Sequence, residues 1–236
     1  MNSRLDHEDN PVMRLPLQMP RGLVFASSIW LFGSWLLTIG VRAPIQSSAA
    51  SYVPGVRVLI LLTLLGVVTA WPMLRLSQVA RIRPCMQSLI DLAAIMAMTQ
   101  IVIWPLRLVT NWPVERISLL TAVIAGWGLL VSAILPLGTA RSSGTSRLLC
   151  MFLVLLLTLG GSLAWWVAGQ VSSSDVSWMA TLSPFTDVHH TMSNGQEQVA
   201  AGQWNHVIVL WIVAAGLWSL PAIDLAAARR RHDGQV

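Results

Sequence analysis

Long apolar stretches alternate along the chain with short segments rich in Pro, Gly, Ser and Arg. Each stretch is close to ~20 residues, the length with which an α-helix crosses the hydrocarbon core of a bilayer. Backbone groups inside a bilayer must be hydrogen-bonded internally, and a helix achieves this within one segment. The pattern therefore predicts an all-α, polytopic integral membrane protein with six transmembrane helices, at Leu23–Val41, Val56–Leu74, Leu89–Leu106, Ile117–Leu137, Leu148–Gly169 and Val207–Ile223.

Composition supports this interpretation independently. The 236 residues are 55% hydrophobic and 11% charged, with a mean hydropathy of +0.65, whereas soluble domains carry about 25% charged residues. Six spans and their loops use nearly the whole length, so we expect a single transmembrane domain over residues 1–236, with residues 170–206 as its longest, outer loop. The basic residues, all arginines, lie mostly near the ends of the stretches, which favours membrane lipid over nucleic acid as the partner.

The arginines also predict the orientation of the chain. Eleven fall on one side of the predicted membrane and four on the other. Because positively charged segments tend to stay in the cytoplasm, both termini are expected there, in agreement with an even number of spans. The four on the outer side lie mostly at helix ends, where a long side chain can extend to water. The cytoplasmic set is Arg4, Arg14, Arg21, Arg75, Arg81, Arg83, Arg141, Arg147 and Arg229–Arg231, and the outer set is Arg42, Arg57, Arg107 and Arg116.

Three segments are not expected to span the membrane. Asn10–Arg21 combines apolar and basic side chains with prolines and is expected to lie along the inner surface. Arg75–Gln87 can form an amphipathic helix until Pro84 interrupts it. The outer loop has no Arg or Lys, and we expect it to pack on the membrane face through its apolar side chains, which are Trp178, Met179, Leu182, Phe185, Met192 and Val199.

Residues with catalytic or metal-binding chemistry are few. Asp187, His189, His190 and His206 are donors of the right type for zinc or copper, but adjacent histidines on a helix point about 100° apart, and no spaced His or Cys pair follows. We therefore predict no metal site. Haem is excluded by the lack of a histidine inside the spans. Because no nucleophile motif and no Walker A sequence is present, we predict no enzyme activity, no catalytic residue and no cofactor.

Two polar residues lie inside the predicted spans. Asp91 is near the cytoplasmic end of its helix, where it can reach water and where a negative charge suits the first turn. Proton transfer through Asp91 is the less favoured alternative. Gln100, near the middle of the third span, is a candidate for a hydrogen bond to another helix. Glycines that would allow helices to approach closely are Gly126, Gly128, Gly160, Gly161 and Gly169.

The carboxy-terminal third suggests a family. An apolar fifth stretch is followed by an outer loop with Leu182-Ser183-Pro184-Phe185, a sixth stretch, and the tail Ala226-Ala227-Ala228-Arg229-Arg230-Arg231. This arrangement resembles the membrane permease subunits of ABC transporters of the ABC-2 exporter type. Those subunits have six helices, cytoplasmic termini, an (S/N)-P-F-like turn before the last helix and a basic tail. The layout agrees over most of the chain, and the similarity of residues is limited to Leu182–Phe185 and the tail.

The resemblance implies the membrane-spanning permease subunit of an ATP-driven exporter, which forms the substrate pathway together with a separate cytoplasmic ATPase. It implies a homo- or hetero-oligomer of membrane subunits, located in the cytoplasmic (inner) membrane of a bacterium. The implied ATPase-docking residues are Arg75, Gln78, Arg81 and Arg83, and the implied outer gate consists of Trp178, Pro184, Phe185 and Trp204. The alternative function is a non-catalytic scaffold subunit of a larger redox or secretion complex, which would also show few polar groups inside its spans.

Overall fold

The computed structural model describes residues 21–41, 48–78, 84–140, 144–171, 181–193 and 198–233. These residues form helices with short connections and contain no strand. Three π-helical turns, labelled η, interrupt the α-helices. The elements are α1 (Arg21–Trp35), η1 (Leu36–Gly40), α2 (Ala49–Leu65), η2 (Gly66–Ala70), α3 (Trp71–Ser77), α4 (Pro84–Thr110), α5 (Val114–Ala140), α6 (Gly144–Leu155), η3 (Leu156–Gly160), α7 (Gly161–Val171), α8 (Pro184–Ser193) and α9 (Ala201–Asp233).

Six helical segments are long and apolar enough to cross a membrane, which confirms the all-α prediction and the number of candidate spans. Most extend beyond the predicted stretches. Within the predicted amphipathic segment Arg75–Gln87, α3 ends at Ser77 and Pro84 begins α4, whereas residues 79–83 lie outside the described residues. A proline is tolerated in the first turn, where its missing N–H has no partner to lose. The segments are Arg21–Gly40, Ala49–Ser77, Pro84–Thr110, Val114–Thr139, Gly144–Gln170 and Ala201–Leu220.

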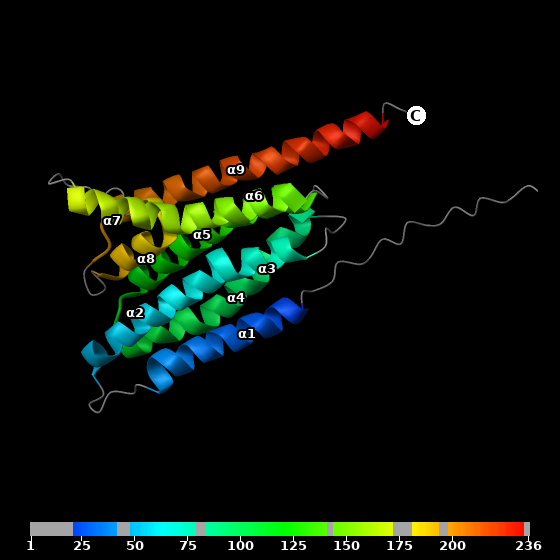
Figure 1. The fold of residues 1–236 in the computed structure, drawn as a ribbon. Coiled ribbons are helices and arrows are strands. Elements are labelled where there is room, and N and C mark those ends of the chain that lie inside the picture. Colours follow the sequence, from blue (N-terminus) through cyan, green and yellow to red (C-terminus); the bar gives the residue numbers. More distant parts are fainter. Residues whose placement is uncertain are drawn as a thin grey trace, which may run out of the picture.

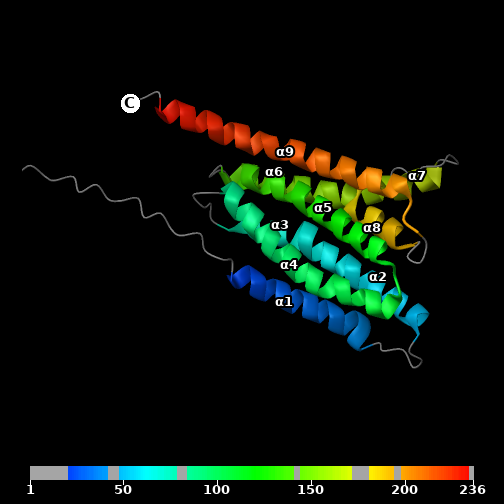
Figure 2. The same cartoon turned by 180° about the vertical axis from the view of Figure 1, so that it is seen from behind.

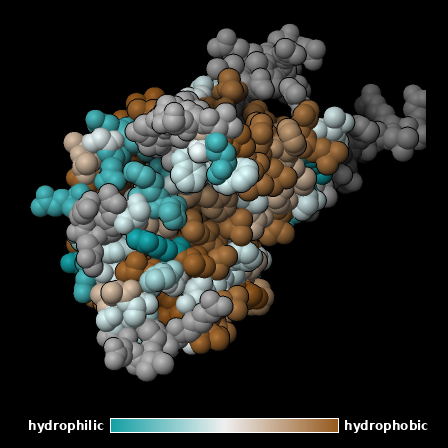
Figure 3. Space-filling model, turned by 60° about the vertical axis from the view of Figure 1, so that its left-hand side comes forward, coloured by the Kyte–Doolittle hydropathy of each residue, from teal (hydrophilic) through white to brown (hydrophobic). Residues whose placement is uncertain are grey.

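Helix α5 lies at the centre of the bundle and packs against α4, α6, α8 and α9 (Figures 1 and 2). In its most apolar window, 72% of the residues are buried inside the structure, against 11% in the first span. Elsewhere large apolar side chains such as Phe32, Leu108 and Ile212 remain exposed. Figure 3 shows this hydrophobic surface along the side of the bundle and hydrophilic residues gathered toward one end. Exposed apolar surface of this extent is typical of a protein whose solvent is lipid.

The bundle has two ends, which are named here by the helices that lie at them. Helices α2, α5 and α9 begin at the end where α8 lies, called here the α8 end (Figure 1). Helix α3 ends at the opposite end, called here the α3 end, where α4 and α6 begin. Arg21 and Asp233 both lie at the α3 end (Figure 1). Which end faces the cytoplasm stays a prediction.

Glycines permit close approach at some of the predicted positions and not at others. A Cβ on Gly126 would lie 2.8 Å from Leu210, and one on Gly128 would lie 2.9 Å from Leu92. A Cβ on Gly161 would lie 2.7 Å from the carbonyl oxygen of Leu182. These contacts confirm the expectation for Gly126, Gly128 and Gly161. For the remaining two glycines it was wrong, because the added Cβ would meet only Leu156 of the same helical segment at Gly160 and nothing within 4 Å at Gly169.

Candidate functional site

Helix α8 is the element around which the polar side chains of the bundle gather. Its residues Val188 and Met192 are fully buried, so this part of the outer loop inserts among the spans, and the prediction that it packs on the membrane face was wrong for it. Local sequence explains the helix: Pro184 occupies the first helical position and Asp187 lies in the first turn, where fixed φ and a negative charge both favour a helix start.

The start of α8 is attached to the fifth span. Ser183 Oγ donates to the carbonyl of Thr158 at 2.8 Å, and its oxygen lies 2.7 Å from Ser162 Oγ. Thr158 belongs to the π-turn η3, and such turns occur often at functional positions. Gly161 makes the attachment geometrically feasible, because any Cβ there would collide with the backbone of Leu182. The Leu182-Ser183-Pro184 turn is therefore fixed by side-chain and backbone contacts together.

The middle of α8 is attached to the fourth and sixth spans through Asp187, which is 3% exposed. Trp127 Nε1 of α5 donates to Asp187 Oδ2 at 2.9 Å. His206 Nε2 of α9 lies 3.0 Å from the same oxygen. One buried carboxylate thus connects three helices, and a buried charged group is costly unless it is paired and hydrogen-bonded, as it is here.

Two arginine side chains donate hydrogen bonds to the carboxy-terminal end of α8. Arg57 of α2 donates to the carbonyls of Met192 and Ser193 at 3.2 and 3.1 Å. Arg116 of α5 donates to the carbonyl of Thr191 at 3.2 Å and to Gln203 Oε1 of α9 at 3.2 Å. Cations satisfy the last carbonyls of a helix and the negative end of its dipole. Arg116 is only 1% exposed, so it does not extend to water as expected for the outer arginines.

These contacts attach α8 to the second, fourth, fifth and sixth spans at once. The set contains a carboxylate, an imidazole, two guanidinium groups and hydroxyls, so its bonds are largely charge-assisted and stronger than neutral ones. The Ser183 hydroxyl contacts another hydroxyl and a carbonyl, neither of which is a general base. The arrangement therefore holds α8 in a defined position against these spans.

The other outer-loop residues are distributed as follows. Pro184 is buried, and Phe185 of α8 and Trp204 of α9 pack against the core; all three belong to helices at the α8 end. Trp178 lies outside the described residues. His189 and His190 are exposed on α8, whereas Asp187 is buried. Among the residues that the structure describes, no three His, Cys, Asp or Glu side chains converge on one point.

A second polar cluster lies at the α3 end. Arg75 Nε of α3 lies 3.0 Å from Asp91 Oδ2 of α4, and Gln87 Nε2 donates to Asp91 Oδ1 at 2.6 Å. Asp91 is 1% exposed and is the eighth residue of α4, so the predictions that it reaches water and lies in the first turn were wrong. Arg75 also donates from Nη1 to Gln78 Oε1 at 2.8 Å, and Gln78 is exposed.

The remaining predicted polar residues are placed as follows. Arg81 and Arg83 lie outside the described residues, as does most of Asn10–Arg21. Gln100 Oε1 accepts from Trp104 Nε1 at 2.8 Å and from Thr121 Oγ1 of α5 at 3.4 Å. The longer of these bonds joins the third and fourth spans, as expected for Gln100.

Sequence reasoning did not identify Arg116, Trp127 or the Ser183–Thr158 contact as parts of one site. One signal was present: the outer loop has no Arg or Lys, and the few arginines assigned to its side include Arg57 and Arg116. Arginines can bind the last carbonyls of a helix, and both do so at the end of α8.

Comparisons with known proteins provide no further identification, since no family model, no curated protein and no solved structure matches the chain. The resemblance to ABC-2 permease subunits therefore stays a prediction.

Proposed function

We propose that this chain is the membrane-spanning permease subunit of an ATP-driven exporter of the ABC-2 type, and that a separate ATPase binds it at the α3 end. Helix α8 is the observation that carries the proposal. It follows the Ser183-Pro184-Phe185 turn and lies within the bundle, bonded to four of the six spans. A permease needs an element that moves together with several spans, because packed helices switch between discrete arrangements as a unit.

Charge supports the orientation in which the α3 end faces the cytoplasm. Eleven of the fifteen arginines belong to that side in the sequence. Of the four at the other side, Arg57 and Arg116 bind carbonyls at the end of α8. Their presence there thus has a structural cause, which strengthens the bias that the remaining arginines give to orientation. The α8 end would then face outward and form the exit of the pathway.

The proposed docking surface consists of the α3 end and the segment that follows it. Arg75 is bound to Asp91 inside the chain, so reversing its charge would disturb the third span as well as a docked partner. Gln78 is exposed just after α3 and accepts from Arg75 Nη1, so a change there alters the surface without removing either member of the pair of Arg75 and Asp91. Motion of an ATPase bound here would pass through Arg75 and Asp91 to α4.

Purification of the tagged chain from its native membrane in a mild detergent, followed by mass spectrometry, tests the proposal. We expect an ATPase to be recovered with it in comparable molar amount. Recovery of redox or secretion subunits and no ATPase would contradict the proposal and support the scaffold alternative. That alternative is favoured by one observation: the charged side chains have partners inside the chain, since Arg75 pairs with Asp91, Arg116 binds the Thr191 carbonyl and Asp187 accepts from Trp127.

Two matched variants test where the ATPase binds. Gln78→Glu adds a negative charge at the α3 end, and His190→Glu adds one at the α8 end; both side chains are exposed. We expect Gln78→Glu to lower the amount of ATPase recovered and His190→Glu to leave it unchanged. Equal recovery with both variants would show that docking at the α3 end is wrong.

A further inference from the structure

Helix α8 is held by several polar contacts, and one of them involves a group that changes charge near neutral pH. His206 Nε2 of α9 lies 3.0 Å from Asp187 Oδ2 of α8. The ordinary pKa of histidine, about 6.5, lies between pH 5 and 8, whereas arginine, tryptophan and serine keep one charge state over that interval. The contact between α8 and α9 is therefore the one whose strength depends on the uptake of a proton.

The geometry allows a proton to reach His206 while α8 stays attached. The side chain of His206 is 29% exposed, whereas that of Asp187 is 4% exposed. His206 is the sixth residue of α9, which begins at the α8 end. Its contact with Asp187 uses Nε2, and its Nδ1 makes no hydrogen bond with another residue that the structure describes. Nδ1 can therefore take a proton from water at this end of the bundle without loss of the contact.

The charge of His206 decides what kind of bond the buried carboxylate receives. Trp127 Nε1 donates to the same oxygen of Asp187 at 2.9 Å and is a neutral donor. When His206 is neutral, both donors to the carboxylate are neutral. When His206 is protonated, the contact becomes an ion pair, and a bond between two charged groups is roughly twice as strong as a neutral one. A buried carboxylate is costly without a paired charge, so protonation of His206 favours the attached position of α8.

The other charged groups around this contact are arginines, exposed histidines and an exposed glutamate. On α8 they are His189 and His190, both exposed. On α5, Arg116 binds the carboxy-terminal end of α8, and Glu115 beside it is exposed. On α2, Arg57 binds the last carbonyls of α8, and α7 has no charged residue.

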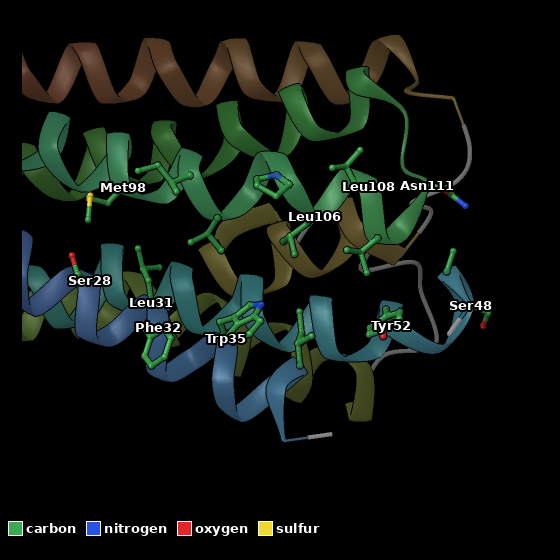
Figure 4. A pocket seen from close by; sticks show the side chains of 16 residues that line it. Ser28, Leu31, Phe32, Trp35, Ser48, Tyr52, Met98, Leu106, Leu108 and Asn111 are labelled. Carbon is green, nitrogen blue, oxygen red and sulfur yellow. The ribbon is translucent and has the colours of Figure 1, made fainter. Parts of the chain in front are cut away.

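The opposite side of the α8 end contributes no group that titrates near neutral pH. The groove between α1, α2 and α4 has Ser48, Tyr52 and Asn111 as its polar lining at this end (Figure 4). Serine and asparagine do not ionise, and tyrosine does so only near pH 10. Among the described residues of this end, the histidines are therefore the groups that change charge between about pH 5.5 and 8, and His206 is the one bonded to a carboxylate.

We propose that His206 makes the attachment of α8 sensitive to protons: its protonation favours α8 bound among the spans, and loss of the proton favours release of α8 from α9. The proposal rests on the contacts of Asp187 and does not require an ATPase. Under the function proposed above, it would make the outer exit of the pathway open more readily at higher external pH.

The reactivity of a buried cysteine on α8 tests the proposal in the purified full chain, in lipid nanodiscs and without an ATPase. Cys85 and Cys150 are first replaced by alanine. Met192→Cys then places a thiol at a fully buried position of α8, and Ser193→Cys places one at the exposed neighbouring position. N-ethylmaleimide should reach the buried thiol only when α8 is released. The ratio of the two reaction rates at one pH measures release, because the pH dependence of thiol chemistry cancels.

We expect this ratio to rise about tenfold from pH 5.5 to pH 8, the difference expected between a hydrogen bond to a charged partner and a neutral one. His206→Gln keeps a neutral donor and should abolish the rise. His206→Lys keeps a positive charge at both pH values and should hold the ratio low at both. His189→Gln removes an exposed histidine of α8 and should leave the rise unchanged.

Several outcomes would overturn the proposal, and one of them needs no change at His206. A ratio that stays the same from pH 5.5 to pH 8 with His206 intact would do so. A full rise in His206→Gln or in His206→Lys would assign the response to another group, as would its loss in His189→Gln. Either variant at His206 is sufficient for this comparison if the other fails to fold.

Discussion

The two ends of the bundle are held together by different chemistry. At the α8 end an additional helix binds four spans, and its partners include Arg57, Arg116 and His206. Among the described residues of the α3 end, an ion pair joins the second and third spans, and the Ser88 hydroxyl donates to the Ser132 carbonyl of α5 at 2.8 Å, a neutral contact. Neutral hydrogen bonds inside membranes contribute about 0.6 kcal/mol each. The α8 end should therefore behave as one unit, whereas spans at the α3 end can separate more easily.

Replacement of Arg116 should have the largest effect. Arg116→Met removes the buried donor to Thr191 and Gln203, and we expect it to lower the free energy of unfolding by about 3 kcal/mol, since hydrogen bonds to charged groups contribute roughly 1.5–3 kcal/mol and the buried acceptors lose their donor. Unfolding in mixed detergent micelles measures this. Arg107→Met, at an exposed arginine, is the control and should change stability by less than about 0.5 kcal/mol. Equal effects of the two changes would contradict the difference between the ends.

Gly161→Ala should weaken the attachment of the start of α8 to the fifth span. Its Cβ would lie 2.7 Å from the Leu182 carbonyl oxygen, and overpacking of this kind usually costs about 1–3 kcal/mol. Gly169→Ala, in the same helix, meets nothing within 4 Å and should be neutral or stabilising by about 0.5–1 kcal/mol. The same unfolding assay compares the two; a destabilised Gly169→Ala with an unaffected Gly161→Ala would refute the close contact.

At the α3 end, the pair of Arg75 and Asp91 can be measured by a double-mutant cycle with Arg75→Met and Asp91→Asn. Because the atoms lie 3.0 Å apart and Asp91 is buried, we expect a coupling energy of about 1.5 kcal/mol. A cycle between Arg75 and Asp187, at opposite ends, should give a value close to zero. A substantial coupling across the bundle would mean that the two ends do not respond independently.

The same substitution at two tryptophans gives the smallest and most direct contrast. Trp127 donates to the Asp187 carboxylate at 2.9 Å, and Trp218 donates to the Leu129 carbonyl at 3.0 Å. Trp127→Phe should cost about 1.5 kcal/mol because its acceptor is charged, and Trp218→Phe about 0.6 kcal/mol. Thermal unfolding in detergent distinguishes the two, and the reverse order would be evidence against charge as the stabilising feature of the α8 end.

The spans were predictable because each must cover a fixed thickness with apolar side chains. Their ends were less predictable, since helices include polar or helix-breaking residues as their first or last member, such as Ser77, Pro84 and Gly144. The insertion of α8 could not be derived from hydropathy. Its apolar residues Val188 and Met192 would suit a position on the membrane surface equally well, and only the contacts of Asp187 and Thr191, buried on the same side of the helix, decide between them.

The polar residues inside the spans could be identified from the sequence, but the residues with which they pair could not. Asp91 and Gln100 were identified as intramembrane polar residues because such groups are rare in spans. The partner of Asp91 is Arg75, which the sequence assigned to a docking loop, because the extension of the second span through Ser77 was not foreseen. The contact of Arg116 with Thr191 joins residues 75 positions apart, and no local pattern specifies such a distance.

Accessibility of single cysteines tests the central claim, a six-span bundle whose α8 end faces outward, most directly. Cys85 and Cys150 are replaced by alanine, and one cysteine is introduced at His190 or at Gln78, both exposed at opposite ends. In intact cells a membrane-impermeant maleimide should label His190→Cys, and it should label Gln78→Cys only after the membrane is permeabilised. Labelling of both positions in intact cells, or of Gln78→Cys alone, would contradict the account.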